Sequence, residues 1–241
     1  MIIGTVVEGP TVRLVIENVL RHILDDHELR FLPVQPLPTL GEFGTGWKGV
    51  RYWCRQMAKD NDLDIFLSDE AGTNLDLLVV HVDADIVTEH DLQEGLGEVN
   101  LDIPVPCPPA DGNAHAIQQL FHRWLLKENL PSKIVFAIPS QDMENWTFAA
   151  LFPSDTLCER PDYECIQSGR NRNNHPGHCL TLQQYAWPGC GKILTRHNGE
   201  IKKSEKRYRR IVGKIVENWE TVCGICTQAA AFEQSVLERT R

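Results

Sequence analysis

The chain alternates short apolar runs with stretches in which apolar residues recur at helical spacing. The apolar runs predict buried strands at residues 2–7, 29–34, 75–85 and 133–139. Between and after them, helical spacing begins at Pro10 and recurs over residues 46–62, 114–128, 142–152, 204–223 and 227–237. Strands that alternate with helices favour an α/β fold in which a mostly parallel sheet is covered by helices on both faces.

Two stretches break this alternation. Residues 86–113, which include the motif IPVPCPP, have little regular pattern and are typical of an insertion or flexible lid. Residues 154–199 are rich in Cys, His, Asn, Arg, Pro and Gly and predict an irregular excursion rather than a second core. We therefore expect an α/β core over residues 1–153, and over residues 154–241 the excursion followed by helices that pack on the core.

Acidic residues stand where the predicted strands end. Glu8 follows the first strand, Asp83 and Asp85 close the strand at 75–85, and Glu144 follows the strand at 133–139. Each acid alone is as readily a solvated loop or helix-cap residue. Together they would meet at one edge, because the carboxyl ends of parallel strands lie there. Residues two apart in a continuing strand project to the same side, so Asp83 and Asp85 would repel each other unless a cation intervened.

This arrangement predicts a divalent-metal site. Mg²⁺ and Mn²⁺ accept carboxylate oxygens and take further oxygen ligands from substrate phosphates. Metals held in this way stabilise charge on the attacking and leaving oxygens of a phosphodiester. A phosphotransfer site like that of a response-regulator receiver is a weaker interpretation, because Lys133 stands before the last strand rather than after it.

The same segments resemble a known family. The motifs VVEGPT and HVDADI are similar to the two signatures of the Toprim domain, a metal-dependent module of topoisomerases, primases and OLD-type nucleases. The segment IPSQDMENWTFAALF resembles the Pro-x-x-x-x-Glu-x-Trp element of small stand-alone bacterial Toprim-like proteins, several of which are associated with phage defence. GTGWKGVRYW is similar to the Gly-rich loop of that group, and the Lys/Tyr-rich segment before AAAFEQ is similar to its C-terminal part.

The resemblance implies a Toprim/Rossmann-like fold and a role for each acid. Glu8 would be a general acid or base or a metal ligand, Asp83 and Asp85 would hold Mg²⁺ or Mn²⁺, and Glu144 would complete the site. OLD-type nucleases carry a second acid four residues after the first, where this chain has Val12, so a second metal stays open unless Glu144 or Asp142 compensates. Such nucleases also use a lysine near the far end, for which Lys203 and Lys206 are the candidates.

Two functions follow from the resemblance. The first is a Mg²⁺- or Mn²⁺-dependent nuclease that cleaves phosphodiester bonds in DNA or RNA. The alternative is a non-catalytic Toprim-like subunit that partners an ATPase or a sensor protein, and Val12 and the net charge of −9 motivate it. Assembly into a homo-oligomer is compatible with both.

Charge and hydropathy bear on the binding partners of the protein and on its location in the cell. A formal charge of −9 is not typical of a nucleic-acid binder, but residues 192–210 are strongly basic whereas residues 60–102 are acidic. This basic segment is either a surface for a polyanion or a solvated helix face. No apolar run approaches the roughly 18 residues of a membrane helix, and the N-terminus lacks the pattern of a signal peptide. We expect a cytoplasmic protein that does not associate with membranes.

Eight cysteines in such a chain are expected to be mostly reduced. The irregular excursion contains six Cys and His residues that could bind a structural Zn²⁺, and such an ion would cross-link and stabilise the segment. These residues are Cys158, Cys165, His175, His178, Cys179 and Cys190. Zinc is nevertheless the less favoured interpretation, because their spacing matches no zinc module. Cys223 and Cys226 have the spacing of a ligand pair, but within a helical segment we expect them to pack inward.

Overall fold

A four-stranded parallel sheet forms the centre of the protein. The computed structural model describes residues 1–37, 44–59, 62–68, 74–88, 92, 107–166, 186–187, 191–192, 194–197 and 200–240. The strands are β1 (Ile2–Val6), β2 (Arg30–Gln35), β3 (Leu77–His81) and β4 (Ile134–Ala137). They lie in the order β2-β1-β3-β4 and all run parallel. The predicted α/β fold with a parallel sheet is therefore confirmed.

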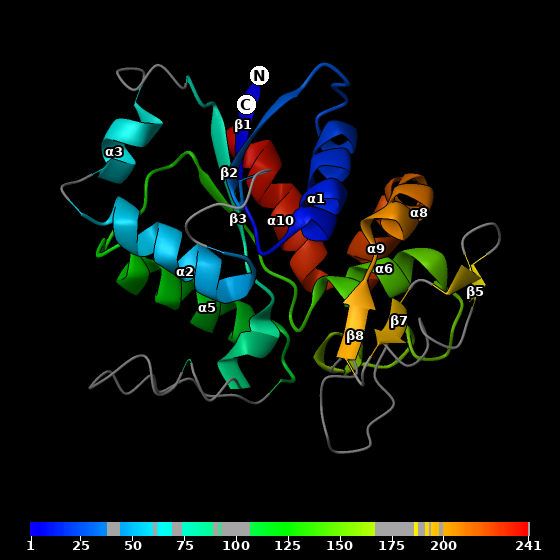
Figure 1. The fold of residues 1–241 in the computed structure, drawn as a ribbon. Coiled ribbons are helices and arrows are strands. Elements are labelled where there is room, and N and C mark those ends of the chain that lie inside the picture. The colour runs from blue at the N-terminus through cyan, green and yellow to red at the C-terminus, as the bar shows by residue number, and fades with distance from the viewer. Residues whose placement is uncertain are drawn as a thin grey trace.

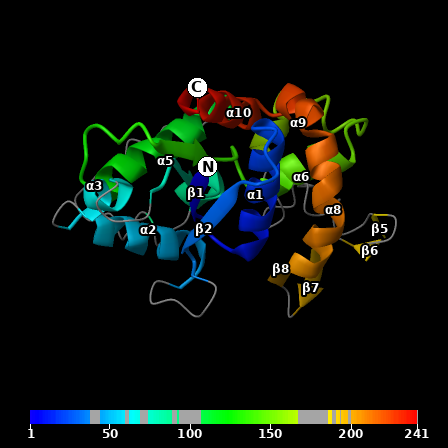
Figure 2. The same ribbon diagram turned by 90° about the horizontal axis from the view of Figure 1, so that it is seen from above.

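Helices cover both faces of this sheet (Figures 1 and 2). One face is covered by α1 (Pro10–Ile23) and α10 (Thr227–Arg239). Helix α8 (Glu205–Glu217) packs on α1, with α6 (Met143–Leu151) and α9 (Trp219–Ile225) beside it. The other face is covered by α2 (Gly46–Met57), α3 (Asp62–Leu67) and α5 (Asp111–Trp124).

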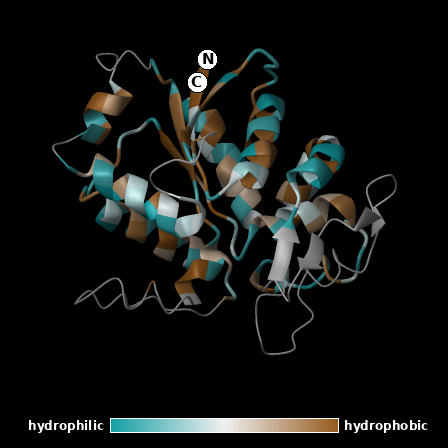
Figure 3. Cartoon of the chain, viewed as in Figure 1, coloured by the Kyte–Doolittle hydropathy of each residue, from teal (hydrophilic) through white to brown (hydrophobic). Residues whose placement is uncertain are grey.

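Alternation along each strand supplies both halves of the core. Leu77 and Val79 of β3 belong to the cluster under α1 and α10, whereas Leu78 and Val80 belong to the cluster under α2 and α5. Successive side chains of a strand point to opposite faces, so a strand covered on both sides must be apolar throughout. All five residues of β3 are buried accordingly, and brown colour follows the strands in Figure 3.

The C-terminal helices share the core of the N-terminal part. Trp146 of α6 packs edge-on against Trp219 of α9, with ring centroids 5.6 Å apart, and stacks on Phe232 of α10 at 6.1 Å. Cys226, between α9 and α10, is fully buried and Cys223 is partly buried. The expectation that these two cysteines pack inward therefore agrees with the structure.

The end of β3 differs from the prediction. The strand ends at His81, and a 3₁₀ helix, η2 (Ala84–Thr88), begins directly after Asp83. The chain turns here because the backbone N–H groups of Ala84 and Asp85 donate to carbonyls of Pro139 and Gln141 in the loop after β4. Asp83 and Asp85 are thus placed by a turn and not by a continuing strand.

The sequence pattern did not predict three further features. These are α3 and two small antiparallel hairpins, in which β5 (Ala186–Trp187) pairs with β6 (Gly191–Lys192) and β7 (Leu194–His197) pairs with β8 (Glu200–Lys203). The second hairpin matters for the site, because β8 leads directly into α8 and ends at Lys203. Most of the predicted insertion at 86–113 lies outside the described residues.

Cys107 and Cys165 form a disulfide bond, which joins the start of α5 to the short 3₁₀ helix η3 (Tyr163–Cys165). The expectation of reduced thiols does not hold for this pair, although Cys54, Cys158, Cys223 and Cys226 are free. Cys165 is therefore not available as a zinc thiolate while this bond is intact. His175, His178, Cys179 and Cys190 lie outside the described residues. Within the described parts of the chain, no helix is both long and apolar enough to cross a membrane.

Candidate active site

The predicted acids meet at the carboxyl edge of the sheet. Glu8 follows β1, Asp83 follows β3, and Asp142 and Glu144 stand at the start of α6 after β4. Because β1, β3 and β4 are neighbours in register, with Val6 beside Val80 and His81 beside Ala137, their ends lie at one level. The sheet order thus explains why acids far apart in sequence come together.

Hydrogen bonds tie these strand ends to one another. The backbone N–H of Asp83 donates to Glu8 Oε1 at 2.8 Å, and the backbone N–H of Met143 donates to Asp83 Oδ1 at 3.0 Å. Each bond joins a carboxylate from one strand end to the backbone of the next. Glu8 and Asp83 therefore help to hold the edge in place as well as supplying charge.

Asp83 is held in its ionised form by its neighbours. It is 4% exposed, which by itself would raise its pKa. Lys203, the nearby His81 with Nε2 3.3 Å from Asp83 Oδ1, and the Met143 N–H outweigh this burial and lower the pKa of Asp83 to about 2. Asp83 thus carries a full negative charge at neutral pH.

Lys203 enters the cluster from the end of β8. Its Nζ lies 2.7 Å from Glu144 Oε2 and 3.8 Å from Asp83 Oδ2. Burial opposes the charged form of this ammonium group, but Glu144 and Asp83 raise the pKa of Lys203 well above its usual value. Lys206, the other predicted lysine, is exposed in the first turn of α8. Of the two candidates, the structure brings Lys203 to the acids.

Glu144 is 1% exposed, and each of its two carboxylate oxygens contacts a partner side chain. Tyr208 of α8 donates its hydroxyl to Glu144 Oε1 at 2.7 Å, while Lys203 pairs with Oε2. This environment keeps one carboxylate fixed without direct contact to solvent. It also explains why β8 and α8, remote in sequence, belong to the site.

Two acids of the cluster retain protons more readily than usual. Burial, Asp83 and Asp85 raise the pKa of the Glu8 carboxyl well above its ordinary value. Burial, Glu144 and Asp83 do the same for Asp142, which is 4% exposed and whose Oδ1 accepts no hydrogen bond from the described residues. Among the described residues, the ammonium group of Lys203 therefore does not offset the repulsion between these acids.

Asp85 contributes to this excess from the first turn of η2. Its backbone N–H donates to the Gln141 carbonyl at 2.9 Å, and its charge raises the pKa of both Glu8 and Asp142. The five acids Glu8, Asp83, Asp85, Asp142 and Glu144 thus influence one another. Among the described residues, however, no group of three or more Asp, Glu, His or Cys side chains is placed so that it could hold a metal ion.

The loop that carries Asp142 is anchored from α5. Asn113 donates to the carbonyl of Ser140 at 3.3 Å, and the Ser140 hydroxyl donates to the carbonyl of Ala110 at 3.2 Å. The Sγ of Cys107, one half of the disulfide, lies 3.4 Å from the same hydroxyl. These contacts fix the β4–α6 connection before the acids of α6 begin.

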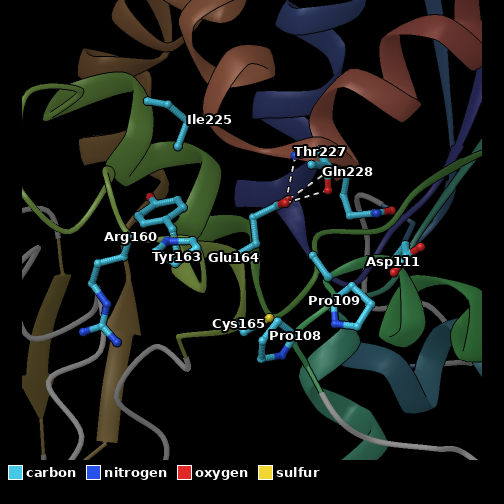
Figure 4. Close-up of a pocket in the computed structure, with 12 residues that line it drawn as sticks. Pro108, Pro109, Asp111, Arg160, Tyr163, Glu164, Cys165, Ile225, Thr227 and Gln228 are labelled. Atoms are coloured by element: carbon cyan, nitrogen blue, oxygen red, sulfur yellow. Dashed lines mark hydrogen bonds between the residues drawn. The ribbon is translucent and has the colours of Figure 1, made fainter.

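The other end of the disulfide leads to a separate pocket of about 510 Å³ (Figure 4). The carboxylate of Glu164 points from its wall to the start of α10, where it accepts bonds from the N–H and hydroxyl of Thr227 and from the N–H of Gln228. None of the five acids of the sheet edge lines this pocket. It is therefore distinct from the acid cluster.

Sequence reasoning missed two residues that complete the cluster. His81 is a polar residue at the end of the apolar run of β3, two residues before Asp83, and this signal was available. Tyr208 had no comparable signal, because its contact with Glu144 depends on how α8 packs.

Comparisons of the chain with family models, with curated proteins and with solved structures found no match.

Proposed function

We propose that this protein is a Mg²⁺- or Mn²⁺-dependent nuclease of the Toprim type, which hydrolyses phosphodiester bonds in DNA or RNA. The observation that carries the proposal is the gathering of Glu8, Asp83 and Glu144 at three adjacent strand ends, with Lys203 paired to Asp83 and Glu144. Ligands of open α/β sheets bind at this edge.

The charge of the cluster supports a divalent cation. Among the described residues, five carboxyl groups gather here while the Lys203 ammonium group pairs with two of them, Asp83 and Glu144, and the pKa of both Glu8 and Asp142 is raised by burial and by neighbouring acids. A cation relieves such repulsion, and an all-oxygen donor set suits Mg²⁺ or Mn²⁺. Asp83 and Asp85 would hold the ion, with Glu8 and Glu144 as the further ligands. When bound, the ion would polarise the phosphate and favour ionisation of water.

The residues of the chain would divide the remaining work. Lys203 directs a fixed positive charge into the site, where it would stabilise the charge that develops on the phosphate oxygens. Glu8 would serve as a general acid or base in place of its role as a metal ligand, and burial and the neighbouring acids, which raise its pKa, favour its protonated form. Asp83, with a pKa of about 2, would stay ionised throughout and hold Lys203 in place.

The test is cleavage of a panel of single- and double-stranded DNA and RNA by the purified protein. We expect cleavage with Mn²⁺ or Mg²⁺, none with EDTA, and a loss of at least about 100-fold in Asp83→Asn/Asp85→Asn. Glu128→Gln, an exposed acid in the loop after α5, is the control and should cleave like the wild type. Metal-dependent cleavage that persists in the double variant would refute the assignment.

The alternative function is a non-catalytic Toprim-like subunit that partners an ATPase or a sensor. Val12, where OLD-type nucleases have a second acid, is 4% exposed and lies in the hydrophobic core. This alternative predicts no cleavage and no change of melting temperature with Mn²⁺. A melting temperature that rises with Mn²⁺ in the wild type but not in Asp83→Asn/Asp85→Asn would therefore favour the nuclease.

A further inference from the structure

Helix α2 presents a stripe of cationic and aromatic side chains to solvent. Lys48, Tyr52 and Arg55 are exposed, and Arg51 is partly exposed on the same side. Residues three and four apart are neighbours on a helix, so these four positions form one continuous row. Val50, Trp53 and Cys54 on the other side are buried against the core. We call the four solvent-facing residues the α2 stripe.

The α2 stripe lines a groove that also contains an aromatic ring, that of Trp47. Its four residues and Trp47 line a groove of about 380 Å³. The ammonium group of Lys48 lies over the Trp47 ring at 5.6 Å, and Tyr52 is 43% exposed between the two arginines. A groove with cations along it and a ring in its wall combines the two elements by which proteins hold single-stranded nucleic acids.

The charge of the α2 stripe contrasts with that of the chain. The protein carries a formal charge of −9, yet α2 contains three cationic residues and no Asp or Glu. Burial and the nearby Arg55 lower the pKa of Arg51, so the two guanidinium groups lie close enough to repel each other. A bound polyanion would relieve this repulsion.

The position of α2 links the stripe to the acid cluster. The backbone N–H of Gly46, the first residue of the helix, donates to the Glu8 carbonyl at 2.7 Å. The helix therefore starts at the carboxyl edge of the sheet and runs outward from it across the face that it shares with α5 (Figure 1). A strand that lies along the stripe would reach the acids at one end.

We infer that the α2 stripe binds the sugar-phosphate backbone of a single-stranded nucleic acid, with Tyr52 stacked on a base, and guides the strand to the acid cluster. The role of guiding a strand to the acids rests on the proposed nuclease function, whereas strand binding itself can be tested without cleavage. Binding depends on Lys48, Arg51, Tyr52 and Arg55. Cleavage depends on the acids, so the two can be measured apart.

The experiment measures binding of the full-length protein to a fluorescent single strand of about 20 nucleotides by anisotropy, in EDTA so that cleavage is absent. Lys48→Gln/Arg55→Gln removes two exposed cations of the stripe. Arg30→Gln/Arg123→Gln is the matched control, because it removes two exposed cations at the start of β2 and near the end of α5. Circular dichroism confirms that both variants are folded.

We expect Lys48→Gln/Arg55→Gln to weaken binding about tenfold or more, and to reduce the slope of log affinity against log salt by about 1.4, or about 0.7 for each phosphate contact. The control should bind within about twofold of the wild type. Tyr52→Leu should weaken single-strand binding by about fivefold or more and leave duplex binding unchanged, because stacking needs unpaired bases.

Each outcome decides one of the two proposals. Binding that is lost in the stripe variant supports the inference, even if no metal condition gives cleavage and the nuclease assignment fails. Equal binding by the stripe variant and the control overturns the inference, even if the protein cleaves nucleic acid. A wild-type protein that binds no single strand in low salt overturns it as well.

Discussion

The ammonium group of Lys203 lies 2.7 Å from the Glu144 carboxylate, and this ion pair joins the end of β8 to the first turn of α6. The Glu144 side chain is 1% exposed and that of Lys203 is 26% exposed. A carboxylate buried to this degree depends on its partner, because an unpaired charge cannot be solvated by the protein interior. The pair therefore ties the second hairpin to the sheet as well as supplying charge to the site.

Lys203→Met should destabilise the protein by about 3 kcal/mol, because it leaves Glu144 buried without its cation. Urea unfolding in EDTA measures this loss. Lys206→Met is a closely matched control, since it removes the same side chain three positions later from an exposed site in α8; its effect should be within about 0.5 kcal/mol. Equal losses in the two variants would contradict the structural role assigned to Lys203.

Asp142 should make the protein less stable as pH rises. Burial, Glu144 and Asp83 raise its pKa in the folded state, whereas an unfolded Asp loses its proton near about pH 3.9. The stabilising contribution is therefore fully present below that pH, and it is lost as pH rises toward the folded-state pKa. Over this interval the folded protein holds one extra proton, which costs about 1.4 kcal/mol of unfolding free energy for each pH unit.

The measurement is urea unfolding at several pH values from about 5 to 8. Asp142→Asn has no proton to lose, so its stability should fall less steeply with pH than that of the wild type. Glu8 has a raised pKa of the same sign, and some slope should therefore remain in the variant. Glu128→Gln, an exposed acid, should leave the slope unchanged. A wild-type slope that survives in Asp142→Asn would show that Asp142 ionises normally.

Glu164 should be important for the C-terminal helix. Its carboxylate is 6% exposed and accepts three hydrogen bonds at the start of α10, from Thr227 Oγ1 at 2.6 Å and from the N–H groups of Thr227 and Gln228 at 2.8 and 3.1 Å. A negative charge at a helix N-terminus is also favoured by the helix dipole. Glu164→Ala should therefore cost about 2 kcal/mol.

Thermal unfolding followed by circular dichroism tests this role of Glu164. Glu159→Ala, an exposed acid in the same connection, is the control and should change stability by less than about 0.5 kcal/mol. If Glu164→Ala unfolds like the control, the start of α10 must be stabilised mainly by packing of residues such as Phe232.

The sheet and its acids were predictable because strong local patterns specify them. The apolar run of β3 can be covered only on both faces, and a parallel order then places Glu8, Asp83 and Glu144 at one edge. The exact placement of Asp83 and Asp85 was not predictable in the same way. It follows from hydrogen bonds between η2 and the loop after β4, two segments that lie far apart in sequence.

The partners of Glu144 illustrate a second limit. Lys203 was one of two lysines suggested by resemblance, and the periodicity of residues 204–223 could not choose between it and Lys206. The choice depends on the hairpin of β7 and β8, whose weak pattern predicted no strand. Tyr208 is the same kind of case, since its hydroxyl reaches Glu144 only because α8 packs beside α6.

The disulfide between Cys107 and Cys165 is a third contact that the sequence did not indicate, and it leads to a prediction of its own. The bond closes a long loop, with a sequence separation of 58, and joins the start of α5 to η3. A cross-link of this span restricts the unfolded chain, so Cys107→Ser/Cys165→Ser should lose about 2–4 kcal/mol of stability.

Urea unfolding with and without dithiothreitol tests the bond directly. The reductant should lower the midpoint of the wild type toward that of Cys107→Ser/Cys165→Ser, and it should not change the midpoint of the double variant. Cys223→Ser, which removes a free and partly buried thiol, should keep the response of the wild type to reductant. If reduction leaves the wild type unchanged, the two cysteines are thiols in solution. Packing and the hydrogen bonds of Ser140 and Asn113 would then hold the β4–α6 connection without a covalent link.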